Sequence, residues 1–551
     1  MKNKFIKAGF LSLAVFAMAS CSKKIDEAYQ NPNADVRVAP ETLLPQIISS
    51  MAANYAGHGP MNDMRYVGAY IQNWQFHAPN STFDRMGYNN SVGDVAQSVW
   101  RVHYFDIGQN NQRMMRWATE EKKWDYVGVG KAIEAWSWLN LTDYHGDVIL
   151  KEAFNTSLVT FKYDKQEEVY EYVKSLAHEA IANLNKTGDG VSQANLAKGD
   201  AFMYNGDVNK WKKFAYGVLA RVHNRYTNKP TLYKADSVIH YANLSINDNA
   251  DNALVKFAAG SISATHNFFG PLRGNLTGTA VANPTGIRQG AYIVKLMNGT
   301  SSAFANIEDP RAIYLLRKNA NGTFVGVEPN KGQTVIPAKD RPENFWGISQ
   351  ETGINNSAGN PAVGIMPRFI FRNDAPFPVM TATEMAFLKA EAYFRKNERE
   401  SALTAYKQGI SLHFDMLTTN YNVNIPAGSE INAAAKTAYI NSVSPASGAG
   451  LTLSKIMLQK YIAMFGHGVL ETWVDMRRYH YIDADPSGTG QVYADFMPPT
   501  GAELMPENNG KFIYRYQPRF NSEYVWNILE LQRIGATAID YHTLPIWFSQ
   551  P

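Results

Sequence analysis

Catalytic chemistry needs residue patterns that this sequence carries only in part. Gly128 to Lys131 offers two glycines and a lysine, but it lacks the further glycine spacing and the Ser or Thr of a phosphate-binding loop. His178 and Glu179 begin the pattern of a zinc-protease helix, yet no second histidine follows four residues after the first. The 12 histidines show no grouping at the spacing of metal ligands. We therefore expect no cofactor, and only a surface Ca²⁺ held by loop carbonyls stays open.

Paired carboxylates are the other pattern that could do chemistry, because a glycosidase uses two of them as acid and as base or nucleophile. Asp143 with Asp147, and Glu471 with Asp475, are candidate pairs. Among 49 acidic residues such pairs arise by chance, so only a measured separation gives them weight. Asp475 and Arg478 lie three apart on a helical stretch and are expected to pair with each other. We expect no enzymatic activity, with a secreted hydrolase as the alternative.

Cys21 is the only cysteine among 551 residues. It follows a leader in which lysines precede the uncharged run from Ala8 to Ser20, and this run is much shorter than the roughly 20 apolar residues of a membrane-spanning helix. Residues 1–20 are therefore predicted to be a signal peptide. The small residues before the thiol resemble a bacterial lipobox, although Met18 replaces its usual leucine. An ordinary cleavage site beside a chance cysteine is the alternative.

Acylation of the Cys21 thiol would hold the protein on a membrane surface, since each buried methylene of a lipid contributes about 0.8 kcal/mol. Residues 21–38 would then form a flexible polar tether. Within it, the acidic pair Asp26 and Glu27 resembles a surface-export signal of Bacteroidetes lipoproteins, and a solvated tether is the alternative. We expect a lipid anchor in the outer membrane, with residues 39–551 as one domain that faces the exterior.

Aromatic residues are abundant, with 30 Tyr, 27 Phe and 11 Trp. Rings on loops beside amide or guanidinium groups can stack on sugar faces or peptide side chains. The structural alternative is that these rings pack into the core and anchor their loops there. Segment 64–90 and the stretch after residue 257 supply such rings, with Trp74 and Trp346 as the strongest candidates. The predicted ligand-binding residues are Trp74, Phe83, Tyr88, Phe269, Arg273, Asn344, Phe345 and Trp346.

Apolar residues at steps of three and four predict helices along much of the chain. The pair at 381–417 resembles a tetratricopeptide hairpin, but the strict repeat period is not sustained, so we expect degenerate repeats interrupted by insertions. Helices are expected at about 92–119, 124–142, 164–184, 207–222, 381–417 and 452–467.

Residues 257–378 and 483–551 differ from the helical parts, because Gly, Asn, Ser, Thr and Pro dominate there. Loop-rich insertions of this length inside a helical frame usually carry function or pack as a cap. The predicted fold class is mainly α: tetratricopeptide-like helix pairs form a scaffold at about 92–245 and 379–480, and it carries long loop-rich insertions and a few short strands.

The net charge argues against a nucleic-acid partner. The whole chain carries a formal charge of +4, and three of its lysines belong to the leader, so the mature protein is close to neutral. Such a surface has no field that would attract nucleic acid.

Five separated motifs, in the same order, resemble those of the SusD/RagB family of outer-membrane nutrient-binding lipoproteins. The motif at Asp309 to Arg311 is an Asp-Pro-Arg tripeptide. The motif at Tyr144 to Val148 is followed by Ile149 where the family has a proline, and the motif at Arg519 to Asn527 matches only in part. The motifs are Trp100 to Asn110, Tyr144 to Val148, Asp309 to Arg311, Gln459 to Arg478, and Arg519 to Asn527.

This resemblance implies tetratricopeptide-like helix pairs decorated with loops, in a protein that forms the lid of a SusC-type, TonB-dependent β-barrel transporter. It also implies a glycan or peptide ligand that is passed to the channel. The sequence leaves the choice between glycan and peptide open. A purely structural interaction module is a further alternative, because helix repeats often have that role.

Overall fold

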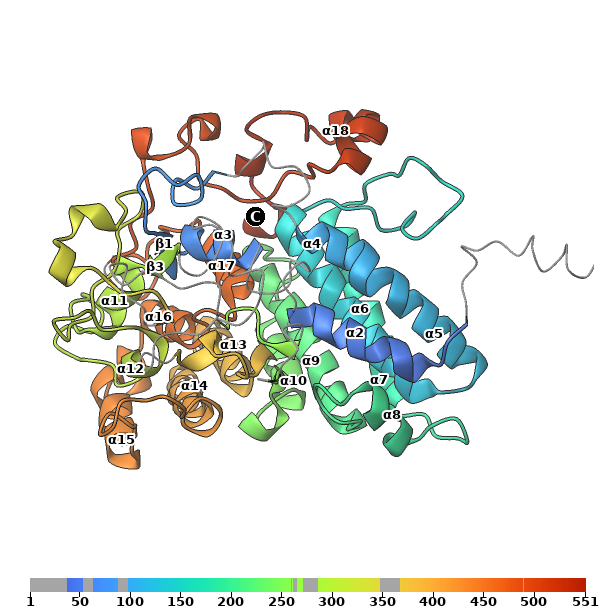
Figure 1. Cartoon of the computed structure of the whole chain (residues 1–551), viewed down its shortest axis with the longest axis horizontal. Helices are drawn as coiled ribbons and strands as arrows, with labels where there is room; N and C mark the ends of the chain where they lie inside the picture. The colour runs from blue at the N-terminus through green and yellow to red at the C-terminus, as the bar shows by residue number, and fades with distance from the viewer. Residues whose placement is uncertain are drawn as a thin grey trace, which may run out of the picture. The chain divides into compact units, whose positions relative to one another are not determined.

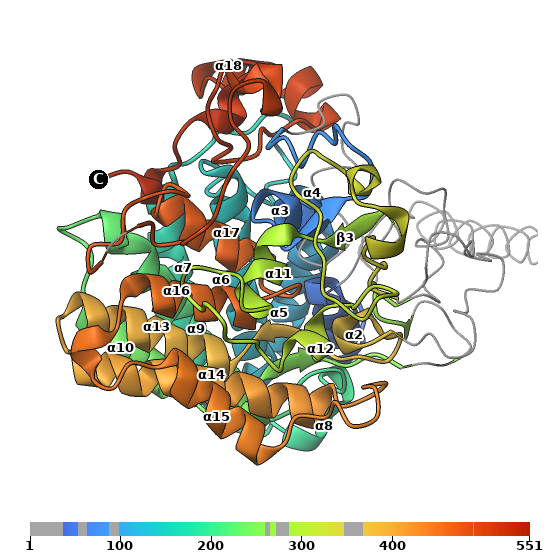
Figure 2. The ribbon, with the colours of Figure 1, turned by 90° about the vertical axis from the view of Figure 1, so that its left-hand side faces the viewer.

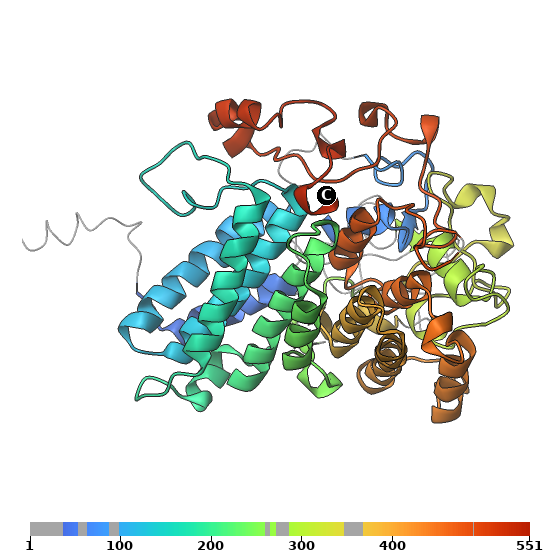
Figure 3. The same ribbon diagram turned by 180° about the vertical axis from the view of Figure 1, so that it is seen from behind.

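The long helices pack against one another in chain order, which builds the scaffold of helix pairs (Figures 1 and 3). This arrangement confirms the predicted mainly α fold class with few short strands. The series, in which each helix packs on the next, is α5 (Asn110–Glu120), α6 (Trp124–His145), α7 (Gln166–Leu184), α9 (Val208–Arg225), α10 (Ala235–Leu244), α13 (Ala382–Arg395) and α14 (Arg399–Asn420).

The computed structural model describes residues 37–52, 63–87, 98–258, 260, 265–270, 286–346, 367–488 and 490–551. Pro40–Pro551 forms one compact unit. Cys21, Tyr88 and Arg273 lie outside the described residues. Within the described ranges, the search for a helix long and apolar enough to span a bilayer finds none.

Side-chain caps explain where helices begin. Asp207 accepts hydrogen bonds from the backbone N–H groups of Asn209 and Lys210 at 2.9 and 3.2 Å, which starts α9 as the sequence predicts. The hydroxyl of Thr381 accepts from the N–H of Glu384 at 3.3 Å and starts α13. These caps satisfy N–H groups that the first helical turn leaves without a partner.

α7 begins one residue later than the sequence predicts, because its N-cap is Lys165 and not Asp164. The carboxylate of Glu168 accepts from the N–H of Lys165 at 3.1 Å and forms the reciprocal part of a capping box. Asp164, the predicted first residue, instead accepts from the N–H groups of Leu150 and Lys151 at 2.9 and 2.8 Å. Its side chain therefore holds the loop between α6 and α7 rather than the helix start.

The helix expected over 92–119 is built from three segments with two kinds of turn, α-helical and π-helical. α4 (Ser98–Arg101) leads without a break into the π-helix η2 (Val102–Gln109), which continues into α5. Residues 92–97 lie outside the described residues. π-helical turns are rare and are often found at functional sites, so η2 is a feature that the apolar periodicity could not reveal.

Two short antiparallel strand pairs tie the loop-rich parts to the scaffold. β1 (Trp74–Phe76) pairs with β3 (Ile287–Gln289), and β2 (Ala253–Val255) pairs with β4 (Phe377–Met380). β3 leads directly into α11 (Ala291–Met297), as Figure 2 shows. Each pair joins segments that lie far apart in the sequence.

The remaining helices have 13 residues or fewer, and single 3₁₀ turns connect several of them. They are α2 (Pro40–Ala52), α3 (Asp63–Tyr70), α8 (Gln193–Gly199), α12 (Ala312–Leu315), α15 (Ala433–Val443), α16 (Leu453–Ala463), α17 (Val469–Arg478), the π-helix η14 (Ser522–Trp526) and α18 (Ile528–Arg533).

A buried network of ion pairs joins α6, α9, α13 and α17. Arg225 contacts the carboxylates of Asp143 and Glu471 at 2.9 and 2.7 Å. Arg221 contacts Glu384 at 2.6 Å and Glu471 at 3.3 Å. Since Asp143 and Glu471 are buried and both bind the same guanidinium, their role is to hold the scaffold together.

The family-like block on α16 and α17 also has a structural role. Asp475 pairs with Arg478 at 2.7 Å, as the sequence predicts. The same carboxylate contacts the ammonium of Lys460 at 2.7 Å, and Arg478 contacts Glu391 at 2.7 Å. All four groups are buried, so each charge depends on its partner for compensation.

Candidate ligand-binding pocket

The rings predicted to bind a ligand lie in the hydrophobic core. Trp74, Phe269, Phe345 and Trp346 each expose 2% or less of their surface. The expectation that these rings are exposed on loops is therefore wrong, and Phe83 and Asn344 are buried as well. Tyr88 and Arg273 lie outside the described residues. Ligand contact by any of these eight residues stays a prediction.

The same rings do come together in space, as one aromatic cluster. Trp74 meets Phe269, Phe345 and Phe465 edge to face, with ring centroids 5.9 to 6.3 Å apart. The indole N–H of Trp346 donates to the carbonyl of Phe269 at 2.6 Å. Rings in such contacts stabilise a core by more than their buried area alone. The ring-rich composition of these loops therefore identified residues that lie together, but these rings pack in the hydrophobic core.

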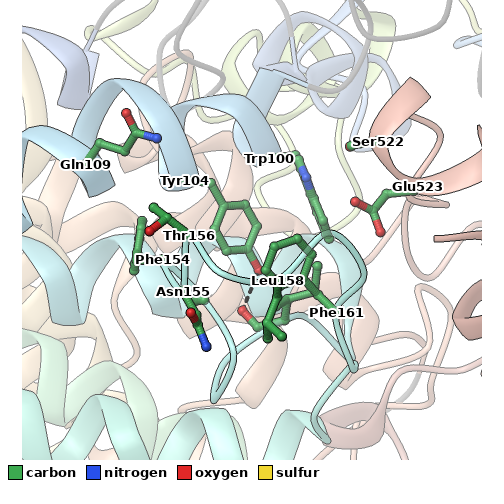
Figure 4. A pocket seen from close by; sticks show the side chains of 12 residues that line it. Trp100, Tyr104, Gln109, Phe154, Asn155, Thr156, Leu158, Phe161, Ser522 and Glu523 are labelled. Carbon is green, nitrogen blue, oxygen red and sulfur yellow. Dashed lines mark hydrogen bonds between the residues drawn. The ribbon is translucent and has the colours of Figure 1, made fainter. Parts of the chain in front are cut away.

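A hollow of about 270 Å³ opens at another place, between η2, the loop that follows α6, and the C-terminal η14 (Figure 4). We call it the aromatic pocket. Its wall is mostly apolar, and amide, hydroxyl and carboxyl groups complete it. The lining residues are Trp100, Tyr104, Gln109, Ile149, Ala153, Phe154, Asn155, Thr156, Leu158, Phe161, Ser522 and Glu523.

Ring contacts hold the back wall of the aromatic pocket in place. Trp100 stacks on Tyr163 and on Phe520, with centroids 5.7 and 5.5 Å apart, and Tyr104 lies 4.9 Å from Trp100. The Tyr104 hydroxyl donates to the carbonyl of Ile149 at 2.7 Å. Burial raises the pKa of Tyr104 well above its usual value, so this hydroxyl stays neutral. The wall is therefore preformed rather than assembled by a ligand.

Polar contacts bind the C-terminal segment to the loop at the front of the pocket. The Glu523 carboxylate accepts from the Tyr163 hydroxyl at 2.8 Å and from the Asn527 amide at 3.0 Å. The Asn527 side chain also accepts from the N–H of Phe161 and donates to its carbonyl, at 3.1 and 2.9 Å. These bonds hold Phe161 half-buried at the rim, together with the exposed side chains of Asn155 and Thr156.

Both π-helices in the described part of the chain contribute to this pocket. η2 supplies Tyr104 and Gln109, and η14 supplies Ser522 and Glu523. Since π-helical turns are concentrated at functional sites, their meeting at one hollow marks the aromatic pocket as the candidate site.

Phe154 carries backbone strain at the same place. Its φ of 62° is in the left-handed region, which a bulky residue rarely adopts. Its ring rests on Gly108 of η2, where a Cβ atom would come within 2.6 Å of the ring. Strain of this kind persists where the surrounding structure enforces it, and it is frequent at ligand sites.

The family-like motifs include part of this pocket, but the sequence did not indicate that these residues form a binding site. Trp100, Tyr104 and Glu523 belong to the family-like motifs, whereas Phe154 and Phe161 were not singled out. The available signal was a pair of rings in a loop rich in Asn, Thr and Ser. No group of three or more metal-binding side chains is found among the described residues.

Comparison with known proteins agrees with this architecture. The family model described as "Starch-binding associating with outer membrane" matches residues 32–499. The fold is similar to that of a SusD/RagB family protein from Bacteroides thetaiotaomicron, with 21% identity, a TM-score of 0.66, and coverage of 93% of this chain and 99% of that chain. A SusD homologue from Bacteroides fragilis shows 16% identity, a TM-score of 0.66 and coverage of 93% and 100%. A chitin-binding protein shows 20% identity, a TM-score of 0.68 and coverage of 93% and 100%. No curated protein matches the chain.

Proposed function

The chain belongs to the SusD-like family of starch-binding proteins that associate with the outer membrane, and on that premise we propose that it binds an oligosaccharide in the aromatic pocket. The single observation that supports this site is the meeting of two π-helices at a preformed, ring-lined hollow. Aromatic rings stack on the apolar faces of sugars, while side-chain amides and hydroxyls at the rim can pair with sugar hydroxyls.

We further propose that the protein delivers its ligand to a SusC-type, TonB-dependent barrel and acts as the lid of that transporter. Acylated Cys21 and the tether over residues 21–38 would keep the lid at high effective concentration beside the channel. A flexible tether also allows the lid to open and close without leaving its partner.

We do not propose a hydrolase. The candidate pairs were Asp143 with Asp147 and Glu471 with Asp475, but Asp143 and Glu471 are buried on Arg225, and Asp475 is buried on Arg478. Enzymatic turnover needs carboxylates within reach of the bond that breaks.

Titration calorimetry of residues 22–551 with glucose, N-acetylglucosamine and peptide oligomers tests the binding proposal. N-acetylglucosamine oligomers are included because one structural neighbour is a chitin-binding protein. We expect one glycan class to bind, and Phe161→Ala to weaken that binding about tenfold, the loss of a ring contact worth roughly 1.4 kcal/mol.

Phe202→Ala is the matched control, because Phe202 is an exposed ring that does not line the pocket. It should leave the affinity unchanged. Binding of peptides alone, or equal losses in both variants, would contradict the proposal.

A further inference from the structure

A second hollow, of about 580 Å³, adjoins the aromatic pocket. Ala153 and Phe154 line both hollows, so the Phe154 ring is a shared wall. The second hollow extends onto α5, α6 and α7, where its chemistry changes from rings to charged and amide side chains. Its characteristic residues are Gln112, Glu134, Trp138, Lys151, Glu168 and Tyr172.

Glu134 is a buried carboxyl group that is only half satisfied. It is 5% exposed, and its Oε1 accepts from the Gln112 amide at 2.9 Å. Its Oε2 accepts no hydrogen bond of good geometry: the Lys131 ammonium is 3.9 Å away, and the Trp138 indole and the Tyr172 hydroxyl make only weak contacts with the carboxyl group. Burial raises the pKa of Glu134, against the lowering effect of Lys131. A buried carboxyl oxygen without a good hydrogen bond destabilises the folded protein unless a ligand or water supplies a donor.

The ion pairs around the second hollow carry an excess of negative charge. Lys151 already pairs with Glu168 and Asp164, at 2.5 and 3.2 Å. Lys131 lies closer to Glu179, at 3.1 Å, than to Glu134. Together with Glu134, four carboxylates therefore share two ammonium groups. Of these groups, Glu134, Glu168 and Lys151 line the hollow, so its wall holds two carboxyl groups against one ammonium group and attracts a cation.

We propose that the two hollows are adjoining subsites for one oligosaccharide, and that the second takes a sugar whose protonated amino group binds Glu134. This inference rests on the proposed function. The aromatic pocket holds one sugar by stacking, the chain passes Phe154, and the ammonium of the next sugar completes the hydrogen bonding of Glu134. A positive charge offsets the burial of that carboxylate in a way that a neutral hydroxyl cannot.

The test compares glucosamine, N-acetylglucosamine and glucose oligomers of equal length, by titration calorimetry on residues 22–551 in buffer near neutral pH. We expect the glucosamine oligomer to bind at least about tenfold more tightly than the two neutral oligomers. Glu134→Gln keeps the shape and the Gln112 contact but removes the charge, and it should abolish this preference.

Glu171→Gln is the control, since Glu171 is an exposed carboxylate on the neighbouring helix α7, where it pairs with Lys174. It should leave the preference unchanged. A crystal structure of the unaltered protein with the glucosamine oligomer provides a readout that needs no variant, and it should place the amino nitrogen within hydrogen-bond distance of Glu134 Oε2.

The outcomes separate this inference from the proposed function. Neutral glycans that bind as tightly as the amino sugar would overturn the inference and leave the proposed function standing. A preference that survives in Glu134→Gln, or an amino group that lies elsewhere in the crystal, would also overturn it. Failure of all glycans to bind would contradict both.

Discussion

Replacing Glu471 by Gln tests the buried ion network, which is the centre of the helical scaffold. The substitution keeps the shape of the side chain but removes a negative charge that contacts Arg225 at 2.7 Å and Arg221 at 3.3 Å. Breaking a buried ion pair typically costs about 3–5 kcal/mol. Since Arg225 retains Asp143 and Arg221 retains Glu384, we expect the lower end of that range.

The pKa of Glu471 is lowered by the same two ion pairs. Burial alone would raise this pKa, but Arg221 and Arg225 lower it from 4.5 to about 2. At 1.36 kcal/mol per pKa unit, this difference corresponds to roughly 3 kcal/mol of folding stability. Because the pKa is lower in the folded state, the stability is fully present above pH 4.5 and is lost as the pH falls through about 2.

Equilibrium unfolding in guanidinium chloride, followed by tryptophan fluorescence, measures the effect. At neutral pH, the guanidinium chloride concentration at the unfolding midpoint should be lower for Glu471→Gln than for the unaltered protein. The difference between the two midpoints should become smaller as the pH approaches 2. Glu398→Gln is the control, because its pair with Lys396 is solvent-exposed and should contribute almost nothing. A loss below about 1 kcal/mol, or a gap that does not depend on pH, would show that Glu471 carries no charge in the folded protein.

Three further predictions address the core, the pocket and the anchor. Trp74→Ala should lower the free energy of unfolding by about 3–5 kcal/mol while the folded protein keeps its glycan affinity; a normal unfolding midpoint with lost affinity would restore Trp74 as a ligand contact. Gly108→Ala should weaken glycan binding in calorimetry, because the added Cβ would come within 2.3 Å of the His103 carbonyl and 2.6 Å of the Phe154 ring and would shift both; unchanged affinity would place η2 and Phe154 outside the site. Cys21→Ala should leave folding and affinity intact but abolish nutrient uptake by cells, and uptake with a non-acylated protein would refute the tethered lid.

The helical scaffold was predictable because its determinants are local. The Asp207 cap lies within three residues of the N–H groups it accepts from, and Asp475 and Arg478 are one helical turn apart. The predicted start of α7 was wrong by one residue, since Asp164 could cap a helix or hold a loop equally well. Its side chain accepts from backbone N–H groups of the loop between α6 and α7.

The candidate site was not predictable in the same way, because its parts are distant in the sequence. Asn527 holds Phe161 across 366 positions. The change from α-helical to π-helical turns in η2 leaves the apolar periodicity almost unaltered, so no pattern marked it. The half-satisfied carboxyl of Glu134 exists only because α5, α6 and α7 enclose it.

The sequence by itself determined the helix pairs, the single thiol and the nearly balanced charge, since each of these depends on residue type and near neighbours. Only the tertiary structure decided which rings face solvent. Trp74 and Trp346 have the composition of a binding loop, but other rings cover them, whereas Phe154 and Phe161 remain at a rim. Whether a ring is exposed depends on which other parts of the chain pack over it, and those parts are distant in the sequence.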